Sequence, residues 1–340
     1  MMKLKTVLYS FIFLVLAEIF LRLGFSVFMS VSFVHPSEII YHYYPMIRDI
    51  RKQYEAKSNS SKVLILSCST LHKEWGGFRE ILQKKLNESR GPESYQILNA
   101  AGIGFSSSDN LNCYKLLSDL KFDIVIDYSG INDSRFNNCP PDVYKEDYSH
   151  LAWNNEINCI LRHHEMDYIV TPFILDFAYQ FFYERIFPNR FIPIHYSMRP
   201  TWWSYGSQFK SLSSFKNNLL SIRDLAAKRK EQIIFIPYCF YLPADYSLER
   251  FKEKKLDYRF APNSRETEIW GRPDNVSGFL NSSNQIVTSV ASFDSAAYLD
   301  IRSMMKKPSY YADICHFSPE GLSLFSDLIA EKIESEKKPK

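Results

Sequence analysis

Lys62-Val-Leu-Ile-Leu66 is a short apolar run, and Ser67-Cys68-Ser69-Thr70 follows it at once. The run has the length and composition of a strand buried on both faces of a sheet. A serine just beyond the carboxyl end of such a strand lies where open α/β sheets bind their ligands. Ser69 is therefore a candidate nucleophile, although Ser69 or Thr70 can equally serve only to cap the helix predicted to contain Phe78.

Two further strand-like runs follow, Tyr95-Gln-Ile-Leu98 and Phe122-Asp-Ile-Val-Ile-Asp-Tyr128. The first leads into Asn99-Ala-Ala-Gly102-Ile-Gly104, where a glycine lets a backbone N–H approach a substrate oxygen. The second ends in Ser129-Gly130-Ile131-Asn132, which places a carboxamide donor at a strand end. Both segments are also ordinary turn sequences. Gly102-x-Gly104 begins a dinucleotide fingerprint too, but Ser107 replaces its third glycine and the expected acidic residue is missing.

Near the other end of the chain, Asp313-Ile-Cys-His316 stands just before a predicted helix. Ser318 can cap this helix and Pro319 suits its first turn. A carboxylate three residues from an imidazole can fix the tautomer of the ring and stabilise its protonated form. Taken alone, the pair is also compatible with surface, capping or metal-ligand residues.

Together, Ser69, Gly104, Gly130-x-Asn132 and Asp313-x-x-His316 resemble the four blocks of the SGNH (GDSL-type) hydrolase family, in the same order along the chain. The resemblance covers residues 62–332. It implies that Ser69 is the nucleophile, His316 the general base and Asp313 its orienting carboxylate. It also implies an oxyanion hole made by the backbone N–H groups of Ser69 and Gly104 and the side chain of Asn132. The family's usual Gly-Asp-Ser is replaced here by Ser67-Cys68-Ser69.

The expected fold is a three-layer α/β/α domain with a mostly parallel sheet, SGNH- or flavodoxin-like, over residues 62–335. Strands that alternate with amphipathic helices favour the same architecture independently; they include a helix at 215–229 and a fourth strand at 232–237. Two stretches, the aromatic 140–212 and the polar 244–300, are predicted to be insertions. Aromatic residues such as Trp202 and Trp203 then either shape a substrate groove or form a satellite core.

The N-terminus carries nearly unbroken apolar character from Thr6 to Val34, behind Lys3 and Lys5. This length can cross a hydrocarbon layer of about 30 Å as a tilted helix. We therefore expect a membrane anchor at 1–35 and a juxtamembrane linker at 36–61. The basic residues predict a cytoplasmic N-terminus and an extracytoplasmic domain. Glu18 and Arg22 share a helix face and can pair or contact another membrane protein. The alternatives to an anchor are a cleaved signal peptide and a buried amphipathic helix.

The composition excludes several classes of function. A net charge of +3 over 340 residues indicates no nucleic-acid partner. Zinc spacing and C-x-x-C pairs are both missing among the six cysteines, so we expect free thiols, no metal and no cofactor. His163-His164-Glu165 resembles a ligand cluster, but adjacent histidines point to different faces of a helix or strand. The six are Cys68, Cys113, Cys139, Cys159, Cys239 and Cys315.

These features predict serine-dependent acyl transfer outside the membrane. The expected substrate is an acylated carbohydrate, and the expected reaction is removal or transfer of O-acetyl groups on a surface or secreted polysaccharide. Water as the acceptor gives an esterase and a sugar hydroxyl gives a transferase; the residues do not distinguish the two. The alternative is a catalytically silent scaffold that binds glycan or assists an export complex, which the altered Ser67-Cys68 favours.

Overall fold

The structure is a computed structural model that describes residues 2–29, 36–54, 59–163, 169–192, 199–292 and 296–336. The chain divides into two compact units. The first unit combines Met1–Pro45 with Tyr148–Ile194, and the second combines Met46–Asp147 with His195–Lys340. The chain therefore leaves the second unit once, after its third strand, and returns before its fourth.

The second unit is built on a five-stranded sheet in the order β2-β1-β3-β4-β5, and every pairing in it is parallel. Its strands are β1 (Ser61–Ser67), β2 (Tyr95–Asn99), β3 (Ile124–Tyr128), β4 (Gln232–Phe235) and β5 (Ala296–Tyr298). Leu64 of β1 lies opposite Leu98 of β2 and Val125 of β3. All three side chains are fully buried, as expected for strands covered on both faces.

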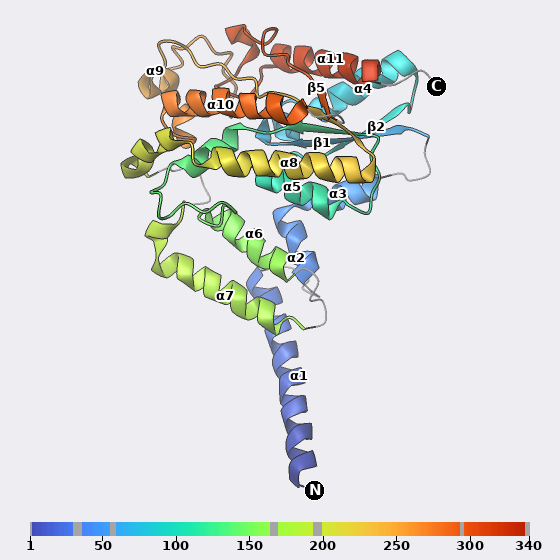
Figure 1. Cartoon of the computed structure of the whole chain (residues 1–340), viewed down its shortest axis with the longest axis vertical. Helices are drawn as coiled ribbons and strands as arrows, with labels where there is room; N and C mark the ends of the chain where they lie inside the picture. Colours follow the sequence, from blue (N-terminus) through green and yellow to red (C-terminus); the bar gives the residue numbers. More distant parts are fainter. Residues whose placement is uncertain are drawn as a thin grey trace. The chain divides into compact units, whose positions relative to one another are not determined.

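Helices cover both faces of this sheet, which confirms the predicted three-layer α/β/α class (Figure 1). On one face α4 and α11 pack together, with the rings of Phe78 and Phe325 5.8 Å apart. On the other face α8 packs between α5 and α10. The helices of this unit are α3 (Pro45–Gln53), α4 (Phe78–Arg90), α5 (Ser107–Leu116), α8 (Ser211–Arg229), α9 (Leu248–Lys252), α10 (Pro273–Ala291) and α11 (Pro319–Glu336).

The two stretches expected to be insertions differ in their structure. The stretch 244–300 contains α10 and β5, which belong to the helix layer and the sheet, so this part of it is not an addition to the fold. Much of the stretch 140–212 lies in the first unit, where α6 (Ala152–Arg162) and α7 (Thr171–Ile186) pack together.

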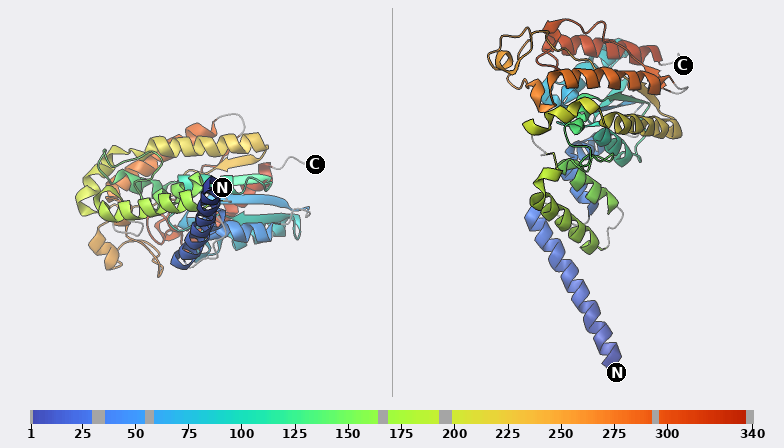
Figure 2. Two further views of the ribbon diagram at one scale, coloured as in Figure 1. Left: turned by 90° about the horizontal axis from the view of Figure 1, so that it is seen from below. Right: turned by 60° about the vertical axis from the view of Figure 1, so that its left-hand side comes forward.

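The first unit joins α6 and α7 to α1 (Met2–Met29) and α2 (Pro36–Tyr43). In α1, Lys5–Phe28 has a mean hydropathy of 2.2 and is only 6% buried, so it is long and apolar enough to cross a membrane. It extends well beyond α7 (Figure 2). Such a segment can act as an anchor or as a signal sequence. The expected apolar segment continues into residues 30–34, which lie outside the described residues.

The expected linker at 36–61 contains two whole helices, α2 and α3, while its residues 55–58 lie outside the described part of the chain. Glu18 and Arg22 of α1 pair as expected: Arg22 Nε donates to the Glu18 carboxylate at 3.0 Å. Glu18 also accepts hydrogen bonds from the start of α7, an interaction that the sequence did not indicate.

Candidate active site

His316 lies on a tight loop that closes just before α11. The Ala312 N–H donates to the His316 carbonyl at 2.7 Å, and the Ser318 N–H donates to the Tyr310 carbonyl at 2.8 Å. Ser318 Oγ accepts from the Gly321 N–H at 3.2 Å, which is the cap predicted for this helix. The loop is thus held on both sides of His316, and its hydrogen bonds fix the direction of the imidazole ring.

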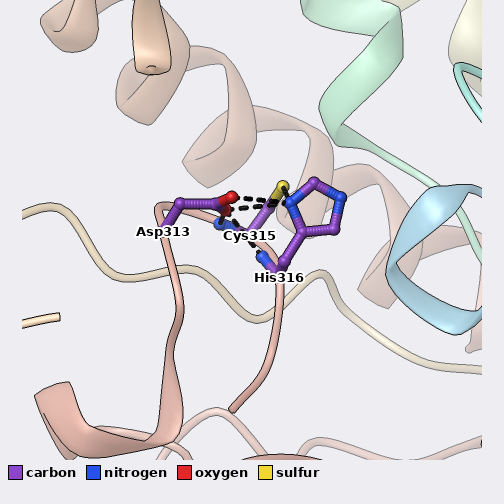
Figure 3. Close-up of side chains that lie close together, drawn as sticks. All are labelled: Asp313, Cys315 and His316. Carbon is purple, nitrogen blue, oxygen red and sulfur yellow. Dashed lines mark hydrogen bonds and ion pairs between the residues drawn. The ribbon is translucent and has the colours of Figure 1, made fainter. Parts of the chain in front are cut away.

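Ser69, His316 and Asp313 form a continuous chain of hydrogen bonds. Ser69 Oγ lies 2.9 Å from His316 Nε2. On the other side of the ring, Nδ1 lies 2.8 and 3.0 Å from the two carboxylate oxygens of Asp313 (Figure 3). Because an ionised carboxylate can only accept, Nδ1 carries the ring proton and Nε2 is left to accept one. This arrangement can move a proton from the serine hydroxyl to the imidazole.

Asp313 is fully buried, yet its surroundings favour the charged form. The N–H groups of Cys315 and His316 donate to Oδ1 at 3.0 and 2.9 Å, and the Arg265 N–H donates to Oδ2 at 2.8 Å. Burial raises the pKa of Asp313, but the electrostatic interaction with His316 and the hydrogen bonds from His316 and Cys315 outweigh it and bring the pKa below its usual range. The carboxylate therefore stays ionised beside the ring.

Trp75 covers one face of the His316 ring. The two ring centroids are 3.4 Å apart and the planes differ by 7°. Trp75 follows Ser69 on the short connection to α4, where Gly76 has a φ of +110°, and a Cβ there would lie 2.6 Å from the Leu322 side chain. No role was expected for Trp75, because nothing local predicts a contact with a residue more than 200 positions away.

Gly104 and Asn132 lie at the ends of the segments that follow β2 and β3, and both line the same cleft as Ser69 and His316. Gly104 has a φ of +78°, a left-handed conformation that favours glycine. Asn132 Nδ2 donates to the Phe105 carbonyl at 2.9 Å, which uses one of its two amide hydrogens. In the described residues, the backbone N–H groups of Ser69 and Gly104 have no protein acceptor.

Trp270 fixes the orientation of the Asn132 carboxamide. Its indole N–H donates to Asn132 Oδ1 at 2.8 Å, so the oxygen is held by Trp270 and the NH₂ group lies on the other side. Trp270 is 2% exposed and comes from the stretch 244–300, which the sequence analysis assigned only to an insertion. Its indole N–H nevertheless determines which way a candidate oxyanion donor points.

The cleft beside Ser69 is small, with a volume of about 90 Å³. None of the described residues of 140–212 lines it, so the substrate groove expected from Trp202 and Trp203 is not formed there. Part of the 244–300 stretch does contribute, through residues 263–270. Besides the six lining positions described above, the cleft is lined by residues that include Glu74, Arg135, Asn263, Arg265 and Ile269.

Asp313, Cys315 and His316 lie close enough together to raise the question of a metal ion (Figure 3). These three side chains are poorly suited to bind a metal ion. The Asp313 oxygens already accept four hydrogen bonds or more, and burial and the Asp313 charge raise the pKa of Cys315 well above its usual range, so its thiol keeps its proton. In the run 163–165, which the sequence analysis above did not expect to bind metal, His163 contacts Asp176 at 3.1 Å, while residues 164 and 165 lie outside the described part.

A buried polar network lies next to Asn132. Asp133 accepts hydrogen bonds from the N–H and hydroxyl of Ser107, at 2.9 and 2.5 Å. Ser129 Oγ donates to Asp127 at 3.0 Å. The pKa of Asp127 is raised to about 7, mainly by burial. The hydrogen bond from Ser129 lowers this pKa, and the nearby charge of Asp133 raises it further. Asp127 therefore holds a proton in the folded protein at a pH where an exposed aspartate has lost it.

No family model matches the sequence, and no curated protein matches it. Solved structures with a similar fold include an acetyl xylan esterase (12% identity, TM-score 0.45), which covers 80% of this chain and 99% of its own. A lipase/acylhydrolase from Enterococcus faecalis (14%, TM-score 0.42) covers 82% and 98%. A GDSL-like lipase from Bacteroides thetaiotaomicron (15%, TM-score 0.46) covers 87% and 97%. These similarities are remote, at identities of 12 to 15%.

Proposed function

We propose that this chain is a serine-dependent acyl-transfer enzyme of the SGNH type. The observation that carries the proposal is the unbroken hydrogen-bonded chain from Ser69 Oγ through His316 to Asp313. An isolated serine hydroxyl is a weak nucleophile, and an adjacent oriented base is what activates it. The three groups come from opposite ends of the sequence, and they meet beside a cleft that a substrate can enter.

In the proposed reaction, Ser69 Oγ attacks the carbonyl carbon of an ester while its proton passes to His316 Nε2. Asp313 stabilises the resulting imidazolium. The carbonyl oxygen becomes an oxyanion, which the backbone N–H groups of Ser69 and Gly104 and the Asn132 NH₂ group stabilise. Collapse expels the alcohol, which takes the proton from His316 and leaves an acyl group on Ser69. Water then gives an acid, or a sugar hydroxyl gives a new ester.

The proposed substrate is a carbohydrate that carries a short acyl group, such as acetyl, on a surface or secreted polysaccharide. The small volume of the cleft beside Ser69 supports a short acyl group over a long chain. The polar side chains around it, among them Arg135, Arg265 and Asn263, support a hydroxyl-rich alcohol portion. Neither feature requires a cofactor or a nucleic acid.

We place this reaction outside the cytoplasm. The apolar segment of α1 supports a single membrane span, and the basic Lys3 and Lys5 before it support a cytoplasmic N-terminus. Reporter fusions at each end of the full chain would test this orientation. An active cytoplasmic reporter at the C-terminus would contradict it.

Labelling by a fluorophosphonate probe tests the proposal for Ser69. The full chain should be labelled, and Ser69→Ala should remove the label. Ser67→Ala is the matched control, because Ser67 Oγ donates to the Tyr128 carbonyl and not to His316; it should keep the label. Well-folded protein that is not labelled would favour the alternative, a silent scaffold that binds glycan or assists an export complex. Acetate release with and without a sugar acceptor then separates esterase from transferase.

A further inference from the structure

The start of helix α7 is hydrogen-bonded to the middle of the apolar segment of α1. The Glu18 carboxylate accepts hydrogen bonds from the Val170 N–H at 2.6 Å, the Thr171 N–H at 3.1 Å and the Thr171 hydroxyl at 2.7 Å. These donors lie at the start of α7, where backbone N–H groups lack partners within the helix. The contact therefore satisfies a carboxylate that would be costly to leave without partners at mid-membrane, and it fixes where α7 begins.

From this point α7 follows α1 toward the end of the apolar segment. The Phe25 ring lies 5.5 Å from Phe173 and 5.3 Å from Phe177, and the Phe28 ring lies 5.4 Å from Phe181. Glu18 stands ten positions before Phe28, the last residue of the span, a distance of about 15 Å along a helix that rises about 1.5 Å per residue. If α1 crosses the bilayer, the first turns of α7 must also lie within it.

The exposed surface of α7 is apolar along one face. We call this face the stripe; each of its members is between 60 and 67% exposed, and they are Leu175, Tyr179, Phe182 and Ile186. Their spacing of four, three and four residues places them in one row along the helix. Large apolar side chains exposed in a row are unusual in contact with water. In the C-terminal half of α1 large apolar side chains are similarly exposed, including Leu23 at 64% and Val27 at 81%.

A groove of about 270 Å³ lies beside the stripe, between α1 and α7. Its lining is almost entirely apolar and includes Phe20, Gly24 and Phe28 from α1 and Ile174, Phe181 and Phe182 from α7. Phe182 belongs to both the groove and the stripe, so the two form one continuous apolar surface. Its aliphatic and aromatic walls suit a hydrocarbon chain.

Polar residues of α7 are arranged as a membrane boundary requires. Toward its C-terminal end, the rings of Tyr179 and Tyr183 stack at 5.8 Å, and the Arg185 guanidinium lies 3.1 Å from the centre of the Phe181 ring. Aromatic and basic side chains gather at the level of lipid headgroups. The acidic Asp176 pairs with Arg162 of α6 at 2.8 Å, and α6 lies on the side of α7 away from the N-terminus of α1 (Figure 1).

From these observations we infer that α7 is a second membrane-embedded element. It lies obliquely in the same leaflet as the C-terminal half of α1, with the stripe against lipid acyl chains and one acyl chain in the groove. The helix pair, rather than α1 alone, then holds the protein at the bilayer. This inference rests on the proposed membrane anchor, but it is independent of the reaction at Ser69.

Quenching by spin-labelled lipids tests the inference on the full chain. Phe182→Cys and, separately, Leu175→Cys are coupled to an environment-sensitive fluorophore; the native thiols are all buried, so the introduced cysteine is the accessible one. The protein is placed in phosphatidylcholine and phosphatidylglycerol vesicles that contain lipids with a nitroxide on the acyl chain. Val15→Cys, in the middle of α1, is the membrane control. Lys84→Cys, at a side chain 75% exposed in the second unit, is the aqueous control.

We expect the label at 175 to lose fluorescence to the lipid nitroxides about as strongly as the label at 15, and the label at 182, nearer the headgroups, to lose it less strongly; both should resist aqueous iodide. The label at 84 should respond to iodide only. Quenching of 175 and 182 by iodide alone, with 15 still quenched by lipid, would overturn the inference and leave the anchor standing. Protection of 175 and 182 from both quenchers would also overturn it, by indicating a protein partner. Loss of lipid quenching at 15 as well would overturn the anchor itself.

Discussion

Trp75 and His316 stack face to face with ring centroids 3.4 Å apart. Such an aromatic contact is worth about 0.5–1.5 kcal/mol beyond the area it buries. Trp75→Ala should therefore lower the kcat for p-nitrophenyl acetate by about two- to tenfold, because the imidazole gains freedom to leave Ser69. Trp75→Phe should restore most of the loss, since it returns an aromatic face.

The control for this prediction is Trp202→Ala, because Trp202 does not line the cleft and should leave kcat unchanged. The pH dependence of kcat should be measured for each variant. A Trp75→Ala enzyme whose kcat and pH profile match those of the parent would show that the stack does not position the base.

Asn132 and Trp270 should act as a unit in catalysis. Asn132→Ala should lower kcat by about 10²–10³-fold, the usual effect of losing one oxyanion donor, with little change in KM. Trp270→Phe removes only the N–H that holds Asn132 Oδ1, so it should give a smaller decrease in kcat. In the Asn132→Ala background, the same Trp270→Phe change should have almost no further effect. Additive effects in this double-mutant cycle would contradict the proposed coupling.

Asp313→Asn should reduce kcat by about 10⁴-fold, because an amide at this position can favour the wrong ring tautomer. Asp300→Asn is a matched control, since Asp300 is paired with Arg302 and does not line the cleft. Circular dichroism should verify that both variants fold. Activity of Asp313→Asn within tenfold of the parent would remove Asp313 from the proposed mechanism.

Asp313 should also make the free energy of unfolding depend on pH in the acidic range. The pKa of Asp313 is lowered in the folded protein, so its contribution to the free energy of unfolding is present above the unfolded value of about 3.9 and is lost as the pH falls through the folded value. Denaturant titrations at pH 3 to 6 should show a steeper loss of stability for the parent than for Asp313→Asn. Parallel curves for the two proteins would contradict this expectation.

Asp127 should produce a pH dependence of the opposite sign. Its folded pKa is raised to about 7, so the stability it provides is full below about pH 4, the unfolded value, and is lost as the pH rises to about 7. Asp127→Asn cannot ionise. The free energy of unfolding of Asp127→Asn should therefore increase relative to that of the parent between pH 4 and pH 7. Above pH 7 the difference between the two proteins should stay constant. An equal difference between the two proteins at pH 5 and pH 8 would rule out a raised pKa.

Local sequence predicted the sheet and the residues at its edge for a simple reason. β1, β2 and β3 are buried apolar runs, and the carboxyl ends of parallel strands meet at one edge, so Ser69, Gly104 and Asn132 had to approach one another. Asp313 and His316 are three residues apart, which makes their pairing local as well. Each of these inferences needs only strand boundaries and sheet direction.

Other features depend on tertiary contacts that no local pattern encodes. Trp75 and Trp270 reach His316 and Asn132 across the fold, and their sequence neighbourhoods look like ordinary loops. The helix α10 was missed because Ser and Asn residues weaken its apolar periodicity, and β5 has only three half-buried residues. The packing of α7 on α1 depends on the Glu18 contact, which joins residues about 150 positions apart.

Packing of α7 on α1 has a consequence for anyone who wishes to prepare a soluble form of the protein. Removing residues 2–29 alone would uncover Phe173, Phe177 and Phe181, whose rings now rest on Phe25 and Phe28, and the shortened chain would be prone to aggregate. A better-behaved form would also replace 148–194 with a short connection, because that segment and the N-terminal helix belong to the same compact unit.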